Sequence, residues 1–279
     1  MHRPIAYVLV RALLPTRVSP NGVTLASIAC GLGAGVLLFF SFAVHQKLAA
    51  LCLFLSAVFD CADGQLARLR GLSSAFGRML DGVGDAIVAT SAVSGAAWSV
   101  WNKYRDPWWF GLFTVLLVGV SAVTGAFHVA MYDHYKNVYL CLTESSRKVE
   151  DLETQPKPAS ILAKLVWNVY RFYSKCQMKY LAGFDPFTPG QMGQLPSPHP
   201  RYGDVYRRHA GDLMRKWRTW FGFGTMIFGL AASIALDVIE YYALARVILL
   251  NVAFYGYMRP AQRRASRAAF REMGLVKAP

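Results

Sequence analysis

The chain has 279 residues, of which 54% are apolar and only 16% are charged, and its mean hydropathy is positive. In a soluble domain about a quarter of all residues are usually charged, so this composition argues against a soluble globular protein and favours one whose surface meets lipid. The formal net charge of +14 leaves nucleic acid, anionic lipid or an anionic substrate as partners, and the placement of the basic residues decides among them.

The first expected element is an amphipathic interfacial helix at residues 2–14, which ends at Pro15. Further apolar segments approach the roughly 20 residues needed to cross a hydrocarbon core. The six segments are 22–42, 48–66, 77–99, 108–130, 219–238 and 241–258. The predicted fold class is therefore all-α and integral to the membrane, with one transmembrane helix for each segment.

The basic residues gather on one side of these spans. If the N-terminus is cytoplasmic, 26 of the 30 Lys and Arg residues lie in cytoplasmic segments. The others are Lys47, Lys103, Arg105 and Arg246. This asymmetry predicts that both termini and the insertion after the fourth span are cytoplasmic. It also assigns the excess charge to topology and to anionic headgroups, which excludes nucleic acid as a partner.

The predicted organisation is divided at the ends of the apolar segments. Its parts are an N-terminal interfacial helix (1–21), four transmembrane helices (22–130), a cytoplasmic insertion (131–218), two further transmembrane helices (219–258) and a basic cytoplasmic tail (259–279).

Two stretches of the insertion have distinct composition. Residues 159–182 mix aromatic with basic side chains at helical spacing, which predicts a second interfacial helix that flanks the mouth of the active site. A dimer contact or a solvated insertion is the alternative for this stretch. Residues 183–203 are rich in Pro and Gly and predict an irregular loop.

Four aspartates cluster at the ends of the second and third spans. Asp60 and Asp63 are three residues apart, so both lie on one face of a helix. Asp81 and Asp85 are four residues apart and also share a face. A turn at residues 71–74 folds the two spans together, so the four carboxylates are predicted to converge near the cytoplasmic surface.

Clustered carboxylates repel one another unless cations neutralise them. Oxygen-only ligands favour magnesium, manganese or calcium, and a pair of such ions can stabilise the attacking and leaving oxygens of a phosphoryl displacement. Arg68 adds a planar donor for phosphate. Small neighbours let backbones or a ligand approach closely, namely Gly64, Ala67, Gly77, Gly82 and Gly84.

At these positions the sequence resembles the CDP-alcohol phosphotransferase family. The matching string is Asp60-x2-Asp63-Gly64-x2-Ala67-Arg68-x8-Gly77-x3-Asp81-x3-Asp85, with no departure at a signature position. The segment that opens the family's first span is similar to Pro20-Asn21-Gly22-Val23-Thr24. The resemblance is strong over residues 19–99 and concerns only the architecture beyond them.

The resemblance implies a role for each matching position. Asp85 would be the catalytic general base that acts on the acceptor hydroxyl. Two divalent cations, Mg or Mn, would be held by Asp60, Asp63, Asp81 and Asp85. The CDP-linked donor would contact Asn21, Gly22, Val23, Thr24, Gly64, Ala67, Arg68 and Ser74.

Other polar residues carry weaker signals. An anionic acceptor could contact His134, Lys136 and Arg259, although basic flanks on the cytoplasmic side explain such residues equally well. A solvated or structural role in a polar loop is expected for His199, Arg201, Tyr202 and His209. Asp237 and Glu240 mark the turn of a far-side helical hairpin, joined through Ile239-Glu240, and need no catalytic explanation.

The function implied is metal-dependent transfer of a phosphatidyl or other phospho-alcohol group from a CDP-linked donor to an alcohol, with release of CMP, in membrane phospholipid biosynthesis. We favour CDP-diacylglycerol as the donor and a polar acceptor such as inositol phosphate, glycerol phosphate or serine. The alternative is a CDP-head-group donor with diacylglycerol or ceramide as acceptor. Membrane lipids and a second copy of the chain are further candidate partners.

Two other classes of protein remain as rivals. A cation transporter would favour discontinuous helices and carboxylates near the bilayer midplane, whereas these aspartates lie at the cytoplasmic end beside Arg68. An inactive membrane scaffold is disfavoured because the four aspartates, Gly64 and Arg68 are all intact.

Overall fold

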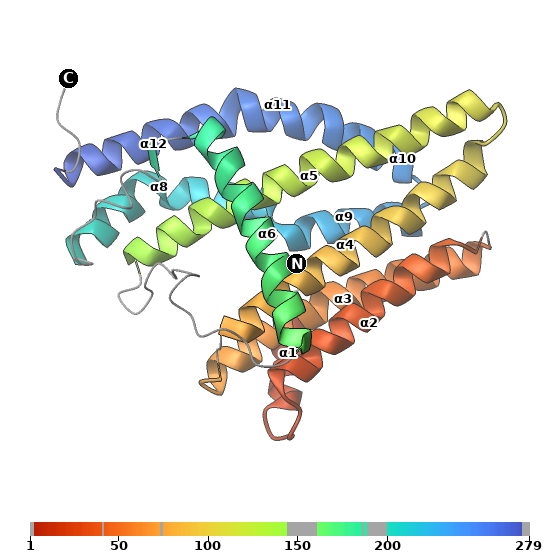
Figure 1. Ribbon diagram of the computed structural model, residues 1–279, viewed down its shortest axis with the longest axis horizontal. Helices are drawn as coiled ribbons and strands as arrows, with labels where there is room; N and C mark the ends of the chain where they lie inside the picture. The colour runs from red at the N-terminus through yellow and green to blue at the C-terminus, as the bar shows by residue number, and fades with distance from the viewer. Residues whose placement is uncertain are drawn as a thin grey trace. The chain divides into compact units, whose positions relative to one another are not determined.

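The computed structural model describes residues 3–40, 42–72, 75–143, 161–185, 187–188 and 200–274. These residues are almost entirely helical, and the described ranges contain no strand (Figure 1). Four helical segments are long and apolar enough to cross a membrane, namely Pro20–Leu37, Ala43–Leu69, Met79–Tyr104 and Trp108–Thr143. The prediction of an all-α integral membrane protein is confirmed at this level, and the fifth and sixth spans stay a prediction.

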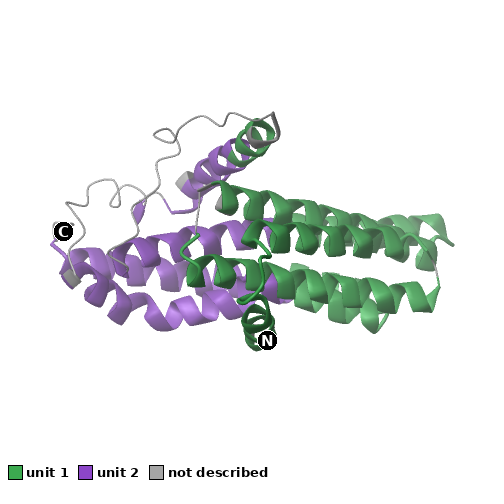
Figure 2. Cartoon of the chain, turned by 90° about the horizontal axis from the view of Figure 1, so that it is seen from below, with its two compact units in different colours: residues 1–123, 158–170, 226–247 green, residues 124–157, 171–225, 248–279 purple. Residues whose placement is uncertain are grey.

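The helices are divided between two compact units (Figure 2). Unit 1 consists of residues 1–123, 158–170 and 226–247. Unit 2 consists of residues 124–157, 171–225 and 248–279. Several helical segments contribute to both units, namely α5 (Trp108–Thr143), α6 (Ile161–Phe184), α9 (Phe223–Ala235) and the π-helical segment Arg246–Leu250.

Unit 1 is built around three helices that lie side by side (Figure 1). They are α2 (Pro20–Leu38), α3 (Ala43–Leu69) and α4 (Ala75–Tyr104). The short helix α1 (Arg3–Leu13) packs against α3 and matches the predicted interfacial helix. The unit is completed by parts of α5 and α6, by most of α9 (Phe223–Ala235) and by α10 (Ile239–Ala245).

Glycines allow α2 and α4 to approach closely. A Cβ atom on Gly31 would lie 2.4 Å from the Val88 side chain, and one on Gly35 would lie 2.0 Å from the Ser91 hydroxyl oxygen. Such contacts are impossible for any larger residue without displacement of a helix, so the small side chains set the spacing of this pair. The close packing places the middle of α4 beside α2.

Local signals in the sequence explain where these helices begin and end. Ser19 caps α2, because its side-chain oxygen accepts a hydrogen bond from the Gly22 amide at 3.1 Å, and Pro20 occupies the first helical turn. Helix α3 ends at Leu69, and Gly71 then adopts the left-handed conformation with φ 67°. The predicted turn at 71–74 therefore begins as expected, and residues 73–74 lie outside the described part of the chain.

A charged cluster joins the end of α4 to the hairpin between α9 and α10. Lys103 contacts Asp237 at 3.2 Å and Glu240 at 3.0 Å, and the Tyr104 hydroxyl donates to Glu240 at 2.6 Å. Burial acts to raise the pKa of the Glu240 carboxyl, but the hydrogen bonds from Tyr104 and Lys103 outweigh it and hold that pKa below its usual value. The hairpin was predicted, but its turn lies at residues 236–238 and not at Ile239-Glu240.

Unit 2 contains the remaining parts of α5 and α6 together with α8 (Pro200–Phe221). Beyond α10 the chain stays helical, with π-helical segments at Arg246–Leu250 and Phe254–Met258 on either side of α11 (Asn251–Ala253), and continues into α12 (Arg259–Glu272). The core of unit 2 is rich in large aromatic side chains. The fully buried members include Tyr135, Trp217, Phe221 and Phe254.

The structure corrects two expectations about the insertion. The predicted irregular loop at 183–203 ends earlier, because helix α8 begins at Pro200. Arg201, Tyr202 and His209 therefore lie on a helix and not in a polar loop, while His199 is outside the described residues. The stretch predicted to be an interfacial helix at 159–182 corresponds to α6, whose exposed side chains include Leu165, Phe172 and Met178.

Candidate metal centre

Three carboxylates from α3 and α4 converge. Asp60 and Asp63 come from α3 and Asp81 comes from α4, and each offers an oxygen atom that lies within 4.8 Å of the others. Asp63 is only 5% exposed, while the other two are half-buried. The donor set fits a hard divalent cation, because all three ligand atoms are carboxylate oxygens.

Asp85 lies one helical turn beyond Asp81 on α4. It is half-buried and close enough to Asp60 for the two carboxylates to interact electrostatically. The structure thus gathers three of the four predicted aspartates within ligand distance of one another and places the fourth nearby.

A threonine on α2 holds one of these carboxylates. The Thr24 hydroxyl lies 2.5 Å from the Asp63 Oδ2 atom and donates to it, and both residues are buried. A charge-assisted hydrogen bond of this kind fixes the rotamer of the carboxylate and orients its second oxygen. Sequence analysis assigned Thr24 to the donor pocket, whereas the structure places its hydroxyl on a candidate metal ligand.

The same stretch of chain matches a known family. Residues 17–143 match the model of the CDP-alcohol phosphatidyltransferase family. Over these residues the chain is similar to the CDP-alcohol phosphatidyltransferases. It contains all four aspartates, Thr24 and the helices α2 to α5. Divalent cations are the cofactors of this family, in agreement with the oxygen donors found here.

A curated relative is similar to part of the chain. Over 97 residues the chain is 33% identical to a phosphatidylinositol phosphate synthase from Corynebacterium glutamicum. The alignment includes 35% of this chain and 43% of that relative, so the chain spans less than half the length of the curated relative it matches.

Other predicted donor contacts of the segment that matches the family model lie around the same helix ends. Asn21 is exposed at the first turn of α2, and Arg68 is exposed with its guanidinium 3.5 Å from the position that a Cβ atom on Gly64 would occupy. Gly22, Gly64 and Ala67 are half-buried. The side chain of Val23 is only 4% exposed and packs in a core cluster with Val58, Ala62 and Leu66. Ser74 lies outside the described residues.

The residues predicted to contact the acceptor all lie in unit 2. Lys136 forms an ion pair with Asp133 at 2.7 Å. The Arg259 guanidinium lies over the Phe184 ring, 4.7 Å from its centroid. The His134 ring packs edge-on against Tyr135, with the ring centroids 5.2 Å apart. Their role toward an acceptor stays a prediction.

Sequence analysis missed several buried polar groups. In unit 2, the Asp185 carboxylate accepts hydrogen bonds from the Tyr135 hydroxyl and the Thr188 hydroxyl, both at 2.7 Å, and from the Phe187 amide at 3.3 Å. The Asp-Pro-Phe-Thr sequence after α6 was a usable signal for the local part of this cluster, because aspartate often accepts from an amide two residues later. Its long-range partner on α5 carries no sequence signal.

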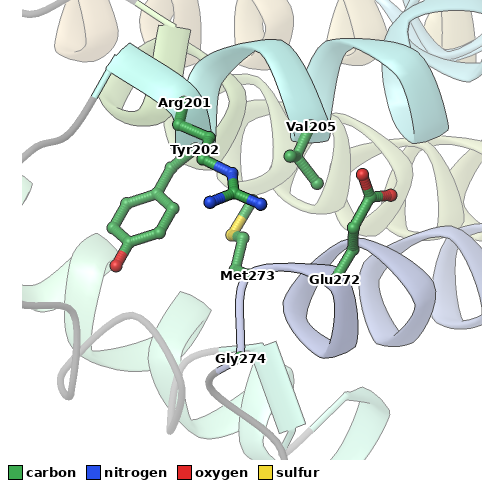
Figure 3. Close-up of a pocket in the computed structure, with 6 residues that line it drawn as sticks. All are labelled: Arg201, Tyr202, Val205, Glu272, Met273 and Gly274. Atoms are coloured by element: carbon green, nitrogen blue, oxygen red, sulfur yellow. The ribbon is translucent and has the colours of Figure 1, made fainter.

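Unit 2 also contains a hollow of about 420 Å³ between the start of α8 and the end of α12 (Figure 3). It is lined by Arg201, Tyr202, Val205, Glu272, Met273 and Gly274. Its one carboxylate, on Glu272, already contacts Arg208 at 2.6 Å and His209 at 2.7 Å. The hollow therefore lacks the cluster of carboxylates that marks the metal centre.

Proposed function

We propose that the chain is a membrane-bound CDP-alcohol phosphatidyltransferase that transfers a substituted phosphate group from a CDP-linked donor to an alcohol and releases CMP. The convergence of Asp60, Asp63 and Asp81 within 4.8 Å, inside the segment that matches the family, is the observation that carries this proposal. A cation transporter or an inactive scaffold does not require this arrangement together with the family signature.

The four aspartates share the binding of divalent cations in the proposed reaction. Asp60, Asp63 and Asp81 would hold a divalent cation, and Asp85 would complete the ligand set for a second. Mg or Mn bound there would supply positive charge that stabilises the phosphate oxygens of the donor. Thr24 keeps Asp63 in its ligand orientation by donating a hydrogen bond to it.

The proton and the leaving group follow from the chemistry of the transfer. As the acceptor oxygen forms its bond to phosphorus, Asp85 accepts the hydroxyl proton, and the bond between that phosphorus and the CMP oxygen breaks. Arg68 is exposed beside Gly64, where its planar guanidinium can donate to a donor phosphate. Asn21 and Gly22, at the first turn of α2, would contact the nucleotide.

We favour CDP-diacylglycerol as donor and a polar alcohol as acceptor. The similarity to a phosphatidylinositol phosphate synthase supports a phosphatidyl donor and an inositol phosphate acceptor. Glycerol phosphate and serine are the other polar acceptors, and diacylglycerol or ceramide with a CDP-head-group donor is the alternative. The basic residues His134, Lys136 and Arg259 are proposed to attract an anionic acceptor.

The proposed topology has six spans, cytoplasmic termini and a cytoplasmic active site. The distribution of basic residues supports it. In a cysteine-free background, a single cysteine at Lys103 should react only from the far side. A cysteine at Ser145, which lies outside the described residues, should react only from the cytoplasm. Labelling of both positions from one face would contradict the topology.

The activity is tested by incubating purified protein with pairs of CDP-donors and alcohols and measuring CMP by mass spectrometry. We expect CMP with at least one donor–acceptor pair in the presence of Mg or Mn, and none after EDTA treatment. Readdition of the metal should restore activity, which separates metal loss from denaturation. Full turnover in a metal-free preparation, or no CMP from any pair, would contradict the proposal.

A further inference from the structure

Arg70 binds an unusual set of acceptors. This residue lies just beyond the last turn of α3 and is neither an aspartate ligand nor part of the family signature. Its guanidinium donates hydrogen bonds to backbone carbonyl oxygens at the end of α1 and in the linker from α1 to α2. The acceptors are the carbonyl groups of Leu13 at 2.8 Å, Leu14 at 3.2 Å, Thr16 at 2.7 Å, and Val18.

Arginine is well suited to this position. The last carbonyl groups of a helix have no partner within the helix and carry partial negative charge. A guanidinium group presents five N–H donors in a rigid plane, so one side chain can satisfy several of these carbonyls, whereas a lysine ammonium is a compact point charge on a flexible stem. Within the described ranges, the hydrogen-bond partners of Arg70 are all backbone carbonyls.

Helix α1, whose end Arg70 holds, packs on the part of α3 that carries Asp60 and Asp63. An isolated helix of 11 residues is marginal in water, so α1 needs tertiary contacts to stay in place. Its fully buried residues Ala6 and Val10 belong to the same core cluster as Ala62 and Leu66 of α3. Ala62 is the immediate neighbour of Asp63, so α1 packs behind the turn that carries this carboxylate.

The linker leads directly into the residue that orients Asp63. Val18, whose carbonyl accepts from Arg70, is followed by Ser19, the N-cap of α2. Thr24 lies in the next turn of α2 and donates to Asp63 at 2.5 Å. Displacement of the linker would therefore move both the first turn of α2 and the hydroxyl that fixes this ligand.

We propose that Arg70 is a positioning residue for the metal and donor site, and that it acts by fixing the α1–α2 linker to the end of α3. The proposal rests on the proposed function in so far as the site binds a CDP-linked donor. It makes Arg70 distinct from Arg68, which is exposed two residues earlier and faces Gly64. The guanidinium of Arg70 donates to the linker carbonyls and acts through Thr24 and Asp63.

The test compares Arg70→Ala and Arg70→Lys with Arg17→Ala, an exposed arginine in the same linker. Two readouts are measured on detergent-purified full-length protein: Mn²⁺ binding by electron paramagnetic resonance, and the KM values for donor and acceptor. Because Arg70→Ala removes charge-assisted hydrogen bonds to the linker, it should weaken Mn²⁺ binding and raise the donor KM by about tenfold or more. The acceptor KM and the Arg17→Ala variant should stay within about twofold of wild type.

Chemical rescue distinguishes positioning from general destabilisation. Low millimolar guanidinium chloride should restore Mn²⁺ affinity and donor KM in Arg70→Ala and leave the wild type unchanged. Arg70→Lys should fall between the two and serves as the test protein if Arg70→Ala does not fold. Wild-type Mn²⁺ affinity in both variants, or an equal rise in both KM values, would overturn the proposal. Mn²⁺ binding without CMP release in the wild type would contradict the proposed function but leave the Arg70 comparison intact.

Discussion

The interiors of unit 1 and unit 2 differ in the size of their side chains. In unit 1, α2 and α4 approach through glycines, so their contact depends on the absence of side chains. In unit 2, the core consists of large rings, with Trp217 and Phe221 5.4 Å apart and Phe221 and Phe254 5.6 Å apart. The helices that carry the carboxylates, α3 and α4, both pack against α2. The two units should consequently fail under opposite changes, enlargement in unit 1 and truncation in unit 2.

The largest expected effect is the loss of turnover when an aspartate of unit 1 is replaced. Asp85→Asn removes the proposed base, and since general-base catalysis contributes typically about 10²- to 10⁴-fold, turnover should fall by that factor. Donor binding should be largely retained, because three candidate ligands remain. Asp63→Asn should instead weaken metal and donor binding together. Identical behaviour of the two variants in a donor-binding titration would rule out this division of roles.

Truncation in unit 2 should produce the largest loss of stability. Trp217 is fully buried, and its indole nitrogen donates to Gln262 at 2.9 Å. Replacement of a buried tryptophan by alanine typically costs about 3–5 kcal/mol, so Trp217→Ala should lower the thermal midpoint in detergent strongly. Trp220 lies on the same helix but is 38% exposed, and Trp220→Ala is the matched control. Equal losses in both variants would show that the aromatic core is not what stabilises the unit.

Enlargement in unit 1 should cost somewhat less free energy of unfolding. A Cβ atom on Gly35 would lie 2.6 Å from the Ser91 carbonyl oxygen, whereas one on Gly33 meets nothing within 4 Å. Because overpacking typically costs about 1–3 kcal/mol, Gly35→Ala should lower the thermal midpoint, and Gly33→Ala should not. An unchanged midpoint in Gly35→Ala would mean that α2 and α4 are free to separate.

The smallest expected effect concerns α6. Its Tyr170 ring lies 3.7 Å from the position of a Cβ atom on Gly82, which is the neighbour of Asp81. If this stretch flanks the mouth of the active site, Tyr170→Ala should raise the KM of one substrate by a few-fold, on the order of 1 kcal/mol, and leave the metal requirement unchanged. The control is Asn168→Ala, an exposed position on the same helix. Wild-type kinetics of Tyr170→Ala in both anionic vesicles and neutral detergent would contradict a role of α6 at the mouth of the active site.

The sequence predicted most where the signal was local. The aspartate pairs share helix faces through their spacing alone, and a left-handed Gly71 follows α3 as expected. Helix α8 was missed because its residues are polar on average, although one of its faces is apolar. The buried residues of that face are Val205, Leu213 and Trp217. A search for long apolar runs cannot detect such a helix.

Contacts between distant residues carried no such signal. The hydrogen bonds of Arg70 to carbonyls more than fifty positions earlier depend on how α1 packs, and backbone acceptors leave no mark on residue identity. The same holds for Tyr135 and Asp185, which are fifty positions apart. The sequence also could not show that Thr24 contacts Asp63, because this contact depends on how α2 packs on α3.

The cluster that joins α4 to the hairpin sets an order of assembly for unit 1. Lys103 and Glu240 are 137 positions apart, so the ribosome completes α4 long before it reaches α10. During that interval the ammonium group and the Tyr104 hydroxyl have no partner from the hairpin and depend on water. Docking of the newly made hairpin brings two carboxylates to the ammonium group, in place of that water. The end of α4 thus reaches its final state only after the chain has been made as far as α10.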